Sequence, residues 1–318
     1  MPEDVDVLLI AGSGRSGSTL LDGMLGSVAG VASVGEARYV WERGHCENRL
    51  CGCGRPFREC PFWAAVLERA YGGCSYELVA EVLAALRNGT RVRHALAFLA
   101  GRRARVERRT AVLRDVLGRL YRAVAEVADA RLVVDSSKSP MYGHLVERAH
   151  GVRLHVVHLV RDPRATAYSW QRHKPLEAGA PREYMERFGP WRSTALWTVW
   201  NLSAARLWSG SSRYRLLRYE DLVRDAPRAV EEVLRFVGHD APATFVDRRS
   251  LVVRPGHRVA GNPDRLRSGL VRIRADEAWQ RELPGATRWL IGAVTAPVRR
   301  TVAAGAGGRE VARHGEAA

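Results

Sequence analysis

Lysine is nearly missing from this chain of 318 residues, in which Lys138 and Lys174 are the two lysines among 50 basic residues. Arginine therefore carries almost all of the positive charge behind the formal net charge of +16. Such a charge suits a polyanionic ligand or an acidic surface, but a coding bias towards arginine accounts for it equally well. Because no basic motif interleaved with aromatic residues is present, we expect no nucleic-acid partner.

Long hydrophobic runs are missing as well. No stretch of about 18 apolar residues indicates a membrane-spanning helix, and the acidic start MPEDVDVLLIAG has too short an apolar run for a signal peptide. We therefore expect a cytoplasmic protein without stable membrane insertion. The length suits one α/β domain over residues 1–300, and the small, polar residues 301–318 predict a disordered tail. The oligomeric state is not determined by the sequence.

Cysteine is scarce, and five cysteines, an odd number, argue against a complete disulfide framework. Cys46, Cys51, Cys53 and Cys60 lie close together, but without the paired C-x-x-C spacing of common zinc sites. Three interpretations stay open: reduced buried thiols, which we favour, a metal site that includes His45, and a local disulfide. We assign no metal ligand from the sequence.

Short apolar runs alternate with helical segments along the chain. Each run ends in small or polar residues and is followed by a helix, which is the pattern of buried parallel strands joined by right-handed crossovers. The sequence therefore predicts a three-layer α/β fold, with a P-loop-like parallel sheet flanked by helices. The predicted strands cover residues 4–11, 132–137, 154–160 and 214–220.

Between residues 44 and 131 this alternation is interrupted. The segment begins with the cysteine-rich loop and continues with amphipathic helical stretches such as YELVAEVLAALRNG. We interpret residues 44–131 as a helical insertion that forms a lid or wall over the crevice at the strand ends.

The first predicted strand leads into AGSGRSGSTLLDGML, which looks like a phosphate-binding loop. Against the pattern G-x-x-x-x-G-K-[ST], Gly12, Gly17 and Thr19 are in place, but Ser18 occupies the lysine position. The backbone cradle is retained, whereas the cation that contacts the β- and γ-phosphates is lost. Arg15 moves the positive charge to the middle of the loop, where a guanidinium stabilises charge on a bridging oxygen. This suits a donor with a single 5′-phosphate.

A second anion anchor is predicted in LVRDPRATAYSW, residues 159–170. Arg161 ends a predicted strand, Pro163 starts a helix, and Ser169 follows Arg161 by eight residues, about two helical turns. We therefore expect Arg161 and Ser169 to face one anion from the same side. Together with the lysine-less loop, the pair indicates a nucleotide that carries two separate phosphates.

These motifs resemble those of sulfotransferases that use 3′-phosphoadenosine 5′-phosphosulfate (PAPS). GSGRSGSTLL is similar to their 5′-phosphosulfate loop, and VRDPRATAYS to their 3′-phosphate motif, with the same spacing of eight. RYEDLVRDAP resembles a later Tyr-Glu-Asp-Leu segment of the family. Arginine in the loop is more similar to tyrosylprotein and carbohydrate sulfotransferases than to the cytosolic small-molecule enzymes. The resemblance covers residues 5–35 and 132–270 and does not identify the acceptor.

The resemblance implies a set of donor-binding residues. The loop holds the 5′-phosphosulfate, Arg161 and Ser169 hold the 3′-phosphate, and Tyr219 contacts the edge of the nucleotide. Residues 256–269 lie where the family closes a loop over the adenosine, with a plain surface loop as the alternative. The implied residues are Gly14, Arg15, Ser16, Gly17, Ser18, Thr19, Leu20, Arg161, Ser169, Tyr219, Arg258, Asn262 and Arg265.

Transfer of a sulfuryl group to a hydroxyl requires a base. Glu36 follows a predicted short strand, at the sheet edge where active residues gather in α/β folds. GEARYVWERG also resembles the Gly-Glu of tyrosylprotein sulfotransferases, in which the glutamate is the base. An ion pair with a neighbour such as Arg38 is the structural alternative.

Histidine is the alternative base, because related cytosolic enzymes use one. His155 and His158 lie within a predicted strand and are expected in the core, whereas His45 and His173 are freer to face the crevice. No histidine comes with a motif.

The strand VVDSSKSP is expected to project Asp135, Ser137 and Lys138 at the same crevice. A lysine in a chain so rich in arginine suggests a compact ammonium directed at sulfonate or acceptor oxygens. A surface lysine that caps the turn before Pro140 is the alternative.

We therefore predict a PAPS-dependent sulfotransferase that acts by in-line displacement on a hydroxyl of a small molecule, glycan or lipid, with 3′,5′-adenosine bisphosphate (PAP) as product and no metal required. Arg15 and Lys138 stabilise the transferring charge, and Glu36 takes the proton. The alternatives are a P-loop small-molecule kinase and a non-catalytic nucleotide-binding or scaffold module.

Overall fold

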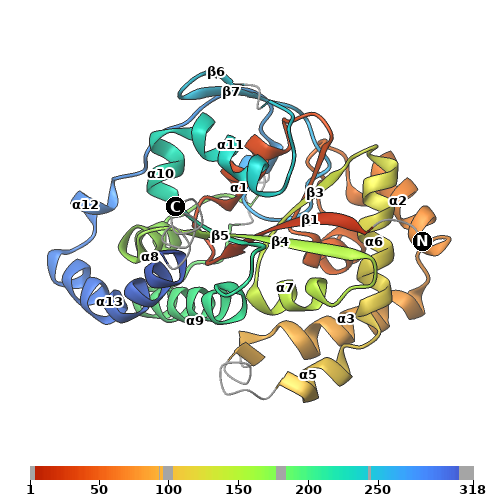
Figure 1. Cartoon of the computed structure of the whole chain (residues 1–318), viewed down its shortest axis with the longest axis horizontal. Coiled ribbons are helices and arrows are strands. Elements are labelled where there is room, and N and C mark those ends of the chain that lie inside the picture. Colours follow the sequence, from red (N-terminus) through yellow and green to blue (C-terminus); the bar gives the residue numbers. More distant parts are fainter. Residues whose placement is uncertain (1–3, 93, 96–102, 177–183, 243–244, 308–318) are drawn as a thin grey trace, which may run out of the picture.

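A parallel sheet of five strands lies at the centre of the chain, with helices on both faces (Figure 1). The computed structural model describes residues 4–92, 94–95, 103–176, 184–242 and 245–307. The strand order is β2-β3-β1-β4-β5, which confirms the predicted three-layer α/β fold. The strands are β1 (Val5–Gly12), β2 (Val31–Gly35), β3 (Leu132–Lys138), β4 (Val152–Val160) and β5 (Tyr214–Arg218).

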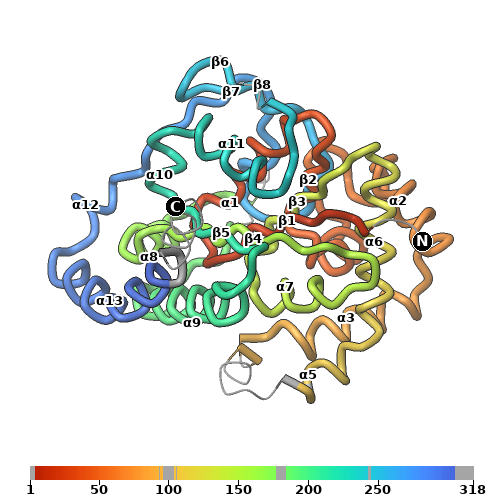
Figure 2. Tube along the Cα trace, viewed as in Figure 1, coloured from red at the N-terminus to blue at the C-terminus, as the bar shows by residue number. Residues whose placement is uncertain are grey.

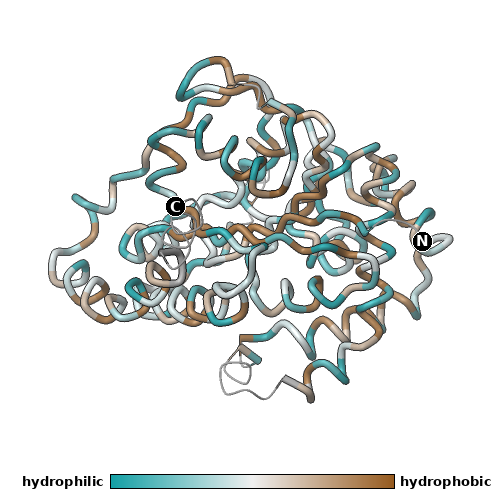
Figure 3. Tube along the Cα trace, viewed as in Figure 1, coloured by the Kyte–Doolittle hydropathy of each residue, from teal (hydrophilic) through white to brown (hydrophobic). Residues whose placement is uncertain are grey.

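β1 is mostly apolar, as its brown colour in Figure 3 shows, and its side chains enter two apolar cores. Val7 and Leu9 of β1 face one apolar core, Leu8 and Ile10 face the other, and all four are fully buried. β1 pairs in parallel with β3 on one side and with β4 on the other. The loop after β1 therefore opens at the middle of the sheet edge.

The helices divide between these two cores, as the trace in Figure 2 allows the reader to follow. The helices that flank the sheet are α1 (Ser18–Leu25), α6 (Leu113–Val127), α7 (Pro140–Glu147), α8 (Pro163–Gln171), α9 (Pro190–Trp208), α10 (Tyr219–Arg224), α11 (Ala226–Phe236) and α13 (Gly285–Gly307). α6, α7 and α9 pack on one face of β1 and its neighbours, and α1, α10 and α11 build the opposite core. α8 follows β4 and packs on α9 and α13.

The described part of the predicted insertion mainly covers a face of the sheet. Its elements are the π-helix η2 (Val40–Cys46), the 3-10 turn η3 (Phe57–Glu59), α2 (Pro61–Tyr71), α3 (Tyr76–Thr90), α5 (Arg103–Arg109) and α6. α6 lies on β1, β3 and β4, while α2 and α3 pack on α6. The apolar side of α6 packs against the sheet. The insertion also contributes part of the wall of the cleft described below, through Arg49, Thr90 and the two residues after Thr90.

A small antiparallel sheet, which the sequence did not predict, lies beside the main sheet. Its strands are β6 (Phe245–Asp247), β7 (Ser250–Val253) and β8 (Gly269–Arg272). Residues 254–268, the β7–β8 connection, contain the 3-10 turn η4 (Pro263–Leu266) and return to the main sheet, where Val259 bridges to Gly35 at the end of β2. This connection therefore reaches the strand ends from a distant part of the sequence.

The C-terminal part of the described chain is helical. A short helix, α12 (Trp279–Glu282), is followed by α13, which continues to Gly307. The remaining short element, the 3-10 turn η1 (Ala37–Tyr39), lies directly after β2. Residues 301–307, at the start of the predicted tail, belong to α13, and residues 308–318 lie outside the described residues. None of the helices that the structure describes is both long and apolar enough to cross a membrane.

Candidate functional site

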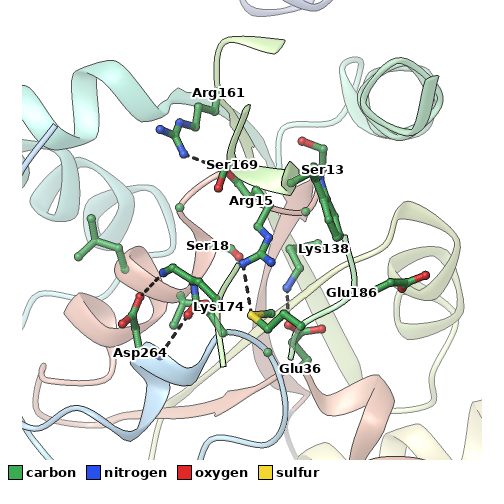
Figure 4. Close-up of a pocket in the computed structure, with 18 of the residues that line it drawn as sticks. Ser13, Arg15, Ser18, Glu36, Lys138, Arg161, Ser169, Lys174, Glu186 and Asp264 are labelled. Carbon is green, nitrogen blue, oxygen red and sulfur yellow. Dashed lines mark hydrogen bonds and ion pairs between the residues drawn. The ribbon is translucent and has the colours of Figure 1, made fainter. Parts of the chain in front are cut away.

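All five parallel strands end at one edge of the sheet, and each leads into a residue that the sequence singled out. Arg15 follows β1, Glu36 follows β2, and Lys138 ends β3. Arg161 follows β4, and Tyr219 follows β5. All five line one cleft of about 1160 Å³, which is drawn in Figure 4. Parallel strands place their carboxyl ends together, so the fold gathers residues that are far apart in the sequence.

The loop after β1 has the backbone of an anion cradle. Gly17 adopts φ +92° and caps α1 without a side-chain hydrogen bond, which leaves the first N–H groups of the helix for a ligand. A Cβ on Gly17 would lie 2.5 Å from Tyr219, and one on Gly14 2.5 Å from Trp170. The Ser16 hydroxyl is buried without a hydrogen-bond partner among the described residues. The loop residues that line the cleft are Ser13, Gly14, Arg15, Gly17, Ser18, Thr19 and Leu20.

Arg15 enters the cleft from a backbone with φ +67°. Its Nη1 donates to the Met185 Sδ at 3.3 Å, and its guanidinium lies 5.1 Å from the centroid of the Trp170 ring. Its Nε and Nη2 are buried and have no hydrogen-bond partner among the described residues. Burial lowers the pKa of Arg15, and the charges of Asp264 and Glu36 oppose this shift. A buried guanidinium with unused donors fits an anionic ligand.

Arg161 and Ser169 lie together beside Arg15 in Figure 4, and both line the cleft. The Nη1 of Arg161 donates to the Arg15 carbonyl at 3.3 Å, and its Nη2 donates to the Asp276 carbonyl at 3.1 Å. Its guanidinium lies 4.4 Å from the centroid of the Tyr219 ring. Arg161 is 5% exposed, and its Nε has no partner within the described chain. The second predicted anion anchor is thus joined directly to the first.

Glu36 and Lys138 form an ion pair within the cleft. The Nζ of Lys138 donates to the Oε1 of Glu36 at 2.6 Å and to the Ser136 carbonyl at 3.1 Å. The side chains of Glu36 and Lys138 are 10% and 12% exposed. Arg38, the partner considered from the sequence, lies over the Tyr39 ring at 4.6 Å. The site therefore places one carboxylate and one ammonium side by side at the ends of β2 and β3.

Asp135 does not reach the cleft, contrary to the prediction from its strand. It is fully buried, its Oδ2 accepts from the Tyr121 hydroxyl at 2.5 Å, and its Oδ1 accepts from the Ser137 backbone N–H at 2.7 Å. Burial raises the pKa of Asp135, and these hydrogen bonds oppose the shift. Ser137 lines the cleft and accepts from the Arg38 backbone N–H at 3.1 Å. Asp135 thus holds the strand end that presents Lys138.

The histidines considered as bases lie elsewhere, and among the described residues no histidine lines the cleft. His158 is fully buried, with its ring nitrogens 2.8 Å from the Tyr214 hydroxyl and 2.8 Å from the Asn201 Oδ1. Burial lowers the pKa of His158 to about 4. The other three histidines considered from the sequence are also outside the cleft lining: His45, His155 and His173.

The β7–β8 connection supplies two of its three predicted residues to the cleft. Arg258 lines the cleft and is 4% exposed. Asn262 also lines it, and its side chain accepts from the Asp264 backbone N–H at 3.2 Å. Arg265 lies outside the lining, and its Nη2 donates to the Leu50 carbonyl at 2.9 Å. Arg265 therefore joins this connection to the cysteine-rich loop.

An aromatic wall of the cleft was missed by the sequence reasoning. Trp170 stacks on Phe188 with ring centroids 4.4 Å apart, and both line the cleft. Leu196 and Trp200 of α9 extend this wall. Their spacing of four residues in FGPWRSTALWTVW places them on one helix face, a signal that could have been used. The prediction had named the helical insertion alone as the source of a wall.

Three cysteines lie together with a histidine that is distant in the sequence. This Cys3His cluster consists of Cys51, Cys53, Cys60 and His257. One ligand atom from each member lies within 4.8 Å of the others. Cys46 is exposed and outside the cluster, and His45 is not a member, so the grouping considered from the sequence was wrong in these two residues. The β7–β8 connection brings His257 to the loop, an approach that residue spacing does not reveal.

Comparison with known proteins adds a family match. A family model described as Sulfotransferase family matches residues 8–243 of the chain. The sulfotransferase domain of the Synechococcus PCC 7002 olefin synthase is 21% identical, with a TM-score of 0.49 over 93% of this chain and 96% of that one. The sulfotransferase domain from the curacin biosynthetic pathway is 19% identical, with a TM-score of 0.47 over 92% of this chain and 98% of that one. A sulfotransferase from Alicyclobacillus acidocaldarius is 12% identical, with a TM-score of 0.42 over 94% of each chain. No curated protein matches the chain.

Proposed function

The chain belongs to the sulfotransferase family, whose members transfer the sulfuryl group of PAPS, and from this premise we propose that the strand-end cleft is its active site. The observation that carries the proposal is that an ion pair of Glu36 and Lys138 shares one cleft with the Nε and Nη2 of Arg15, which have no hydrogen-bond partner among the described residues. One cavity thereby contains a group that can bind the donor anion, a cation for the transferred group and a base.

The donor is proposed to lie along the loop after β1. The backbone N–H groups of Gly14 to Thr19 and the Arg15 side chain bind the 5′-phosphosulfate, because the helix N-terminus and a buried guanidinium both favour anions. Arg161 and Ser169 bind the 3′-phosphate. Arg258 and Asn262, which line the same cleft, are proposed as further donor contacts, whereas Arg265 is left out because it contacts the cysteine-rich loop.

Transfer then proceeds as a displacement at sulfur. The acceptor oxygen forms a bond to sulfur, the bond from sulfur to the 5′-phosphate oxygen breaks, and the hydroxyl proton passes to the Glu36 carboxylate. Arg15 and the loop amides stabilise the charge that develops on the leaving phosphate, and Lys138 stabilises the sulfonate oxygens. PAP leaves with both of its phosphates. The absence of histidine from the described cleft lining favours Glu36 as the base.

The acceptor is proposed to be a hydroxyl on an apolar body, which favours a small molecule or a lipid over a glycan. The support is the wall formed by Trp170, Phe188, Leu196 and Trp200, because aromatic and aliphatic walls select apolar ligand surfaces. A screen of aliphatic and phenolic alcohols against sugars, with labelled donor, tests this preference.

A substitution at Glu36 tests the proposed role most directly. We expect Glu36→Gln to keep PAP binding and to lower kcat about 10²–10⁴-fold, because the amide retains the shape but cannot take the proton. Transfer of labelled sulfate and PAP affinity are measured on the same preparation. Glu186→Gln is the matched control, since Glu186 lines the cleft but is exposed and paired with Arg192. Unchanged turnover in Glu36→Gln would assign the base elsewhere.

The two alternatives from the sequence are weaker. A small-molecule kinase needs a cation on the β- and γ-phosphates, and Ser18 stands at that place in the loop. A non-catalytic scaffold leaves the buried Glu36–Lys138 pair without a role, although burying two charges costs free energy.

A further inference from the structure

We propose that the Cys3His cluster binds a zinc ion, which connects the cysteine-rich loop to the β7–β8 connection behind the donor cleft. Three thiolates and one imidazole are a common ligand set of structural zinc. The cluster lies outside the cleft lining, so the metal is not part of the transfer chemistry. Whether the cluster binds zinc does not depend on the proposed function.

Three separations within the cluster are close to those of a tetrahedral site, and all of its ligand atoms lie within 4.8 Å of one another. Zinc with sulfur ligands at about 2.3 Å and nitrogen at about 2.0 Å implies separations of about 3.8 Å between sulfurs and about 3.5 Å between sulfur and nitrogen. The Sγ atoms of Cys53 and Cys60 are 3.7 Å apart. The Nδ1 of His257 lies 3.2 Å from the Cys60 Sγ and 3.9 Å from the Cys51 Sγ. A single ion therefore fits between these atoms after small side-chain shifts.

Neighbouring residues also fix the positions of the side chains of the Cys3His cluster. The His257 ring stacks on Phe62 with centroids 4.4 Å apart, and its carbonyl accepts from the Trp63 Nε1 at 2.9 Å. Cys51 and Cys60 are fully buried, and a turn closes between Cys51 and Gly54, whose N–H donates to the Cys51 carbonyl at 2.9 Å. Such outer contacts orient metal ligands before the metal arrives.

Zinc at this place would support the donor cleft, a consequence that rests on the proposed function. Arg258, the next residue after His257, lines the cleft, and its carbonyl accepts from the Gly52 N–H of the cysteine-rich loop at 2.9 Å. Val259 then pairs with β2, and its carbonyl accepts from the Glu36 N–H at 2.8 Å. One ion thus fixes the backbone that presents Arg258 and supports Glu36.

Metal analysis of the full chain tests the proposal without using activity. The protein is purified in the presence of zinc, its tag is removed, and bound metal is measured by mass spectrometry. We expect about one zinc per chain, and Cys53→Ser and Cys60→Ser should lose most of it. Cys46→Ser and Cys74→Ser are the matched controls, since both cysteines lie outside the cluster, and they should keep the metal. His257→Cys should also keep it, because a fourth thiolate replaces the imidazole.

Cobalt substitution of the unmutated chain provides a measurement that no folding defect of a variant can obscure. Cobalt(II) should give the thiolate charge-transfer and visible bands of a tetrahedral sulfur-rich site, and zinc should remove them. A chain without metal whose intact mass shows a disulfide, or whose cysteines all react freely under native conditions, would overturn the proposal. The two proposals can fail separately. Zinc content is measured without any transfer assay, and transfer by Glu36→Gln is measured on protein with full zinc content.

Discussion

At the scale of single residues, Arg15 and Ser18 show how a phosphate loop changes its ligand. Ser18 removes the cation from the place of a γ-phosphate, while Arg15 introduces one at the centre of the loop, where its Nε and Nη2 have no partner in the described chain. Because both changes lie in a short segment, their meaning could be predicted from the sequence. The ion pair of Glu36 and Lys138, which are 102 residues apart, could not.

The first residue-scale prediction concerns Arg15. We expect Arg15→Ala to weaken PAP binding about tenfold or more, since hydrogen bonds to charged groups contribute about 1.5–3 kcal/mol, and to lower kcat about 10²–10³-fold. Arg15→Lys should recover part of the binding but not the fork geometry. Isothermal titration and single-turnover transfer measure the two effects. Arg218→Ala is the control, because Arg218 is exposed and outside the cleft lining; an equal loss there would remove the special role of Arg15.

A second residue-scale prediction concerns Asp22, a carboxyl buried in α1 beneath the loop. Burial raises its pKa from 3.8 to about 6, and Arg258 and the Ser33 hydroxyl oppose the shift. The folded chain therefore binds an extra proton between about pH 4 and pH 6, so this group destabilises the fold as pH rises through that range. Above about pH 6 the cost is constant.

Asp22→Asn should remove this pH dependence. We expect the variant to unfold with a free energy about 1–3 kcal/mol higher than the parent at pH 8, with the gain shrinking towards pH 4. Urea unfolding across this pH range measures the difference. Asp240→Asn, at an exposed position, should follow the parent at every pH. A constant difference between Asp22→Asn and the parent would contradict the proposed titration.

At the scale of elements, the β7–β8 connection decides how the ends of β2 and β3 are used. Val259 bridges to Gly35, and Gly261 lies against the side chain of Glu36. The connection also brings Arg258 and Asn262 to the cleft. The antiparallel strands on either side of this connection were not predicted, because strands of so few residues show little hydrophobic periodicity in the sequence.

Gly261→Ala should change catalysis through this contact. Gly261 has φ +91°, and a Cβ there would lie 2.6 Å from the Glu36 Oε1. We expect a loss of about 1 kcal/mol in folding free energy from the backbone strain and a fall in kcat of about tenfold or more, because the carboxylate must move. Gly269→Ala is the matched control, with φ +88° and open space around the Cβ. It should lose similar stability and keep its turnover; a fall of kcat in both would point to strain alone.

At the scale of the whole molecule, ligand binding should stabilise the fold. PAP at about 100 times its Kd raises the free energy of unfolding by about 2.7 kcal/mol, which corresponds to a rise in Tm of several degrees for a chain of this size. ATP with Mg²⁺ should produce a smaller rise, since the loop has no cation for the β- and γ-phosphates. Thermal unfolding with each nucleotide measures the difference. A rise with ATP and none with PAP would contradict the placement of the donor.

The net charge of the molecule says less about its functional site than the order of its strands does. The excess of arginine is compatible with several partners, whereas the order β2-β3-β1-β4-β5 brings five separate segments to one cleft. The helical insertion shows the same limit, because its amphipathic helices predicted burial but not the surface that buries them. α6 lies on the sheet face, and the aromatic part of the cleft wall comes from α8, α9 and the residues between them, while Arg49 and Thr90–Val92 of the insertion line another part of the cleft.

The sequence by itself determined what depends on neighbours along the chain: the strands of the main sheet and the helices that follow them, the anion loop from Gly12 to Thr19, the spacing of Arg161 and Ser169, and the class of donor they suit. Backbone geometry and local spacing carry this information. Only the tertiary structure decided that Asp135 is buried, that no described histidine lines the cleft, that Glu36 faces Lys138, and that His257 joins three cysteines. These facts depend on strand register and on the path of a long connection, which no local pattern specifies.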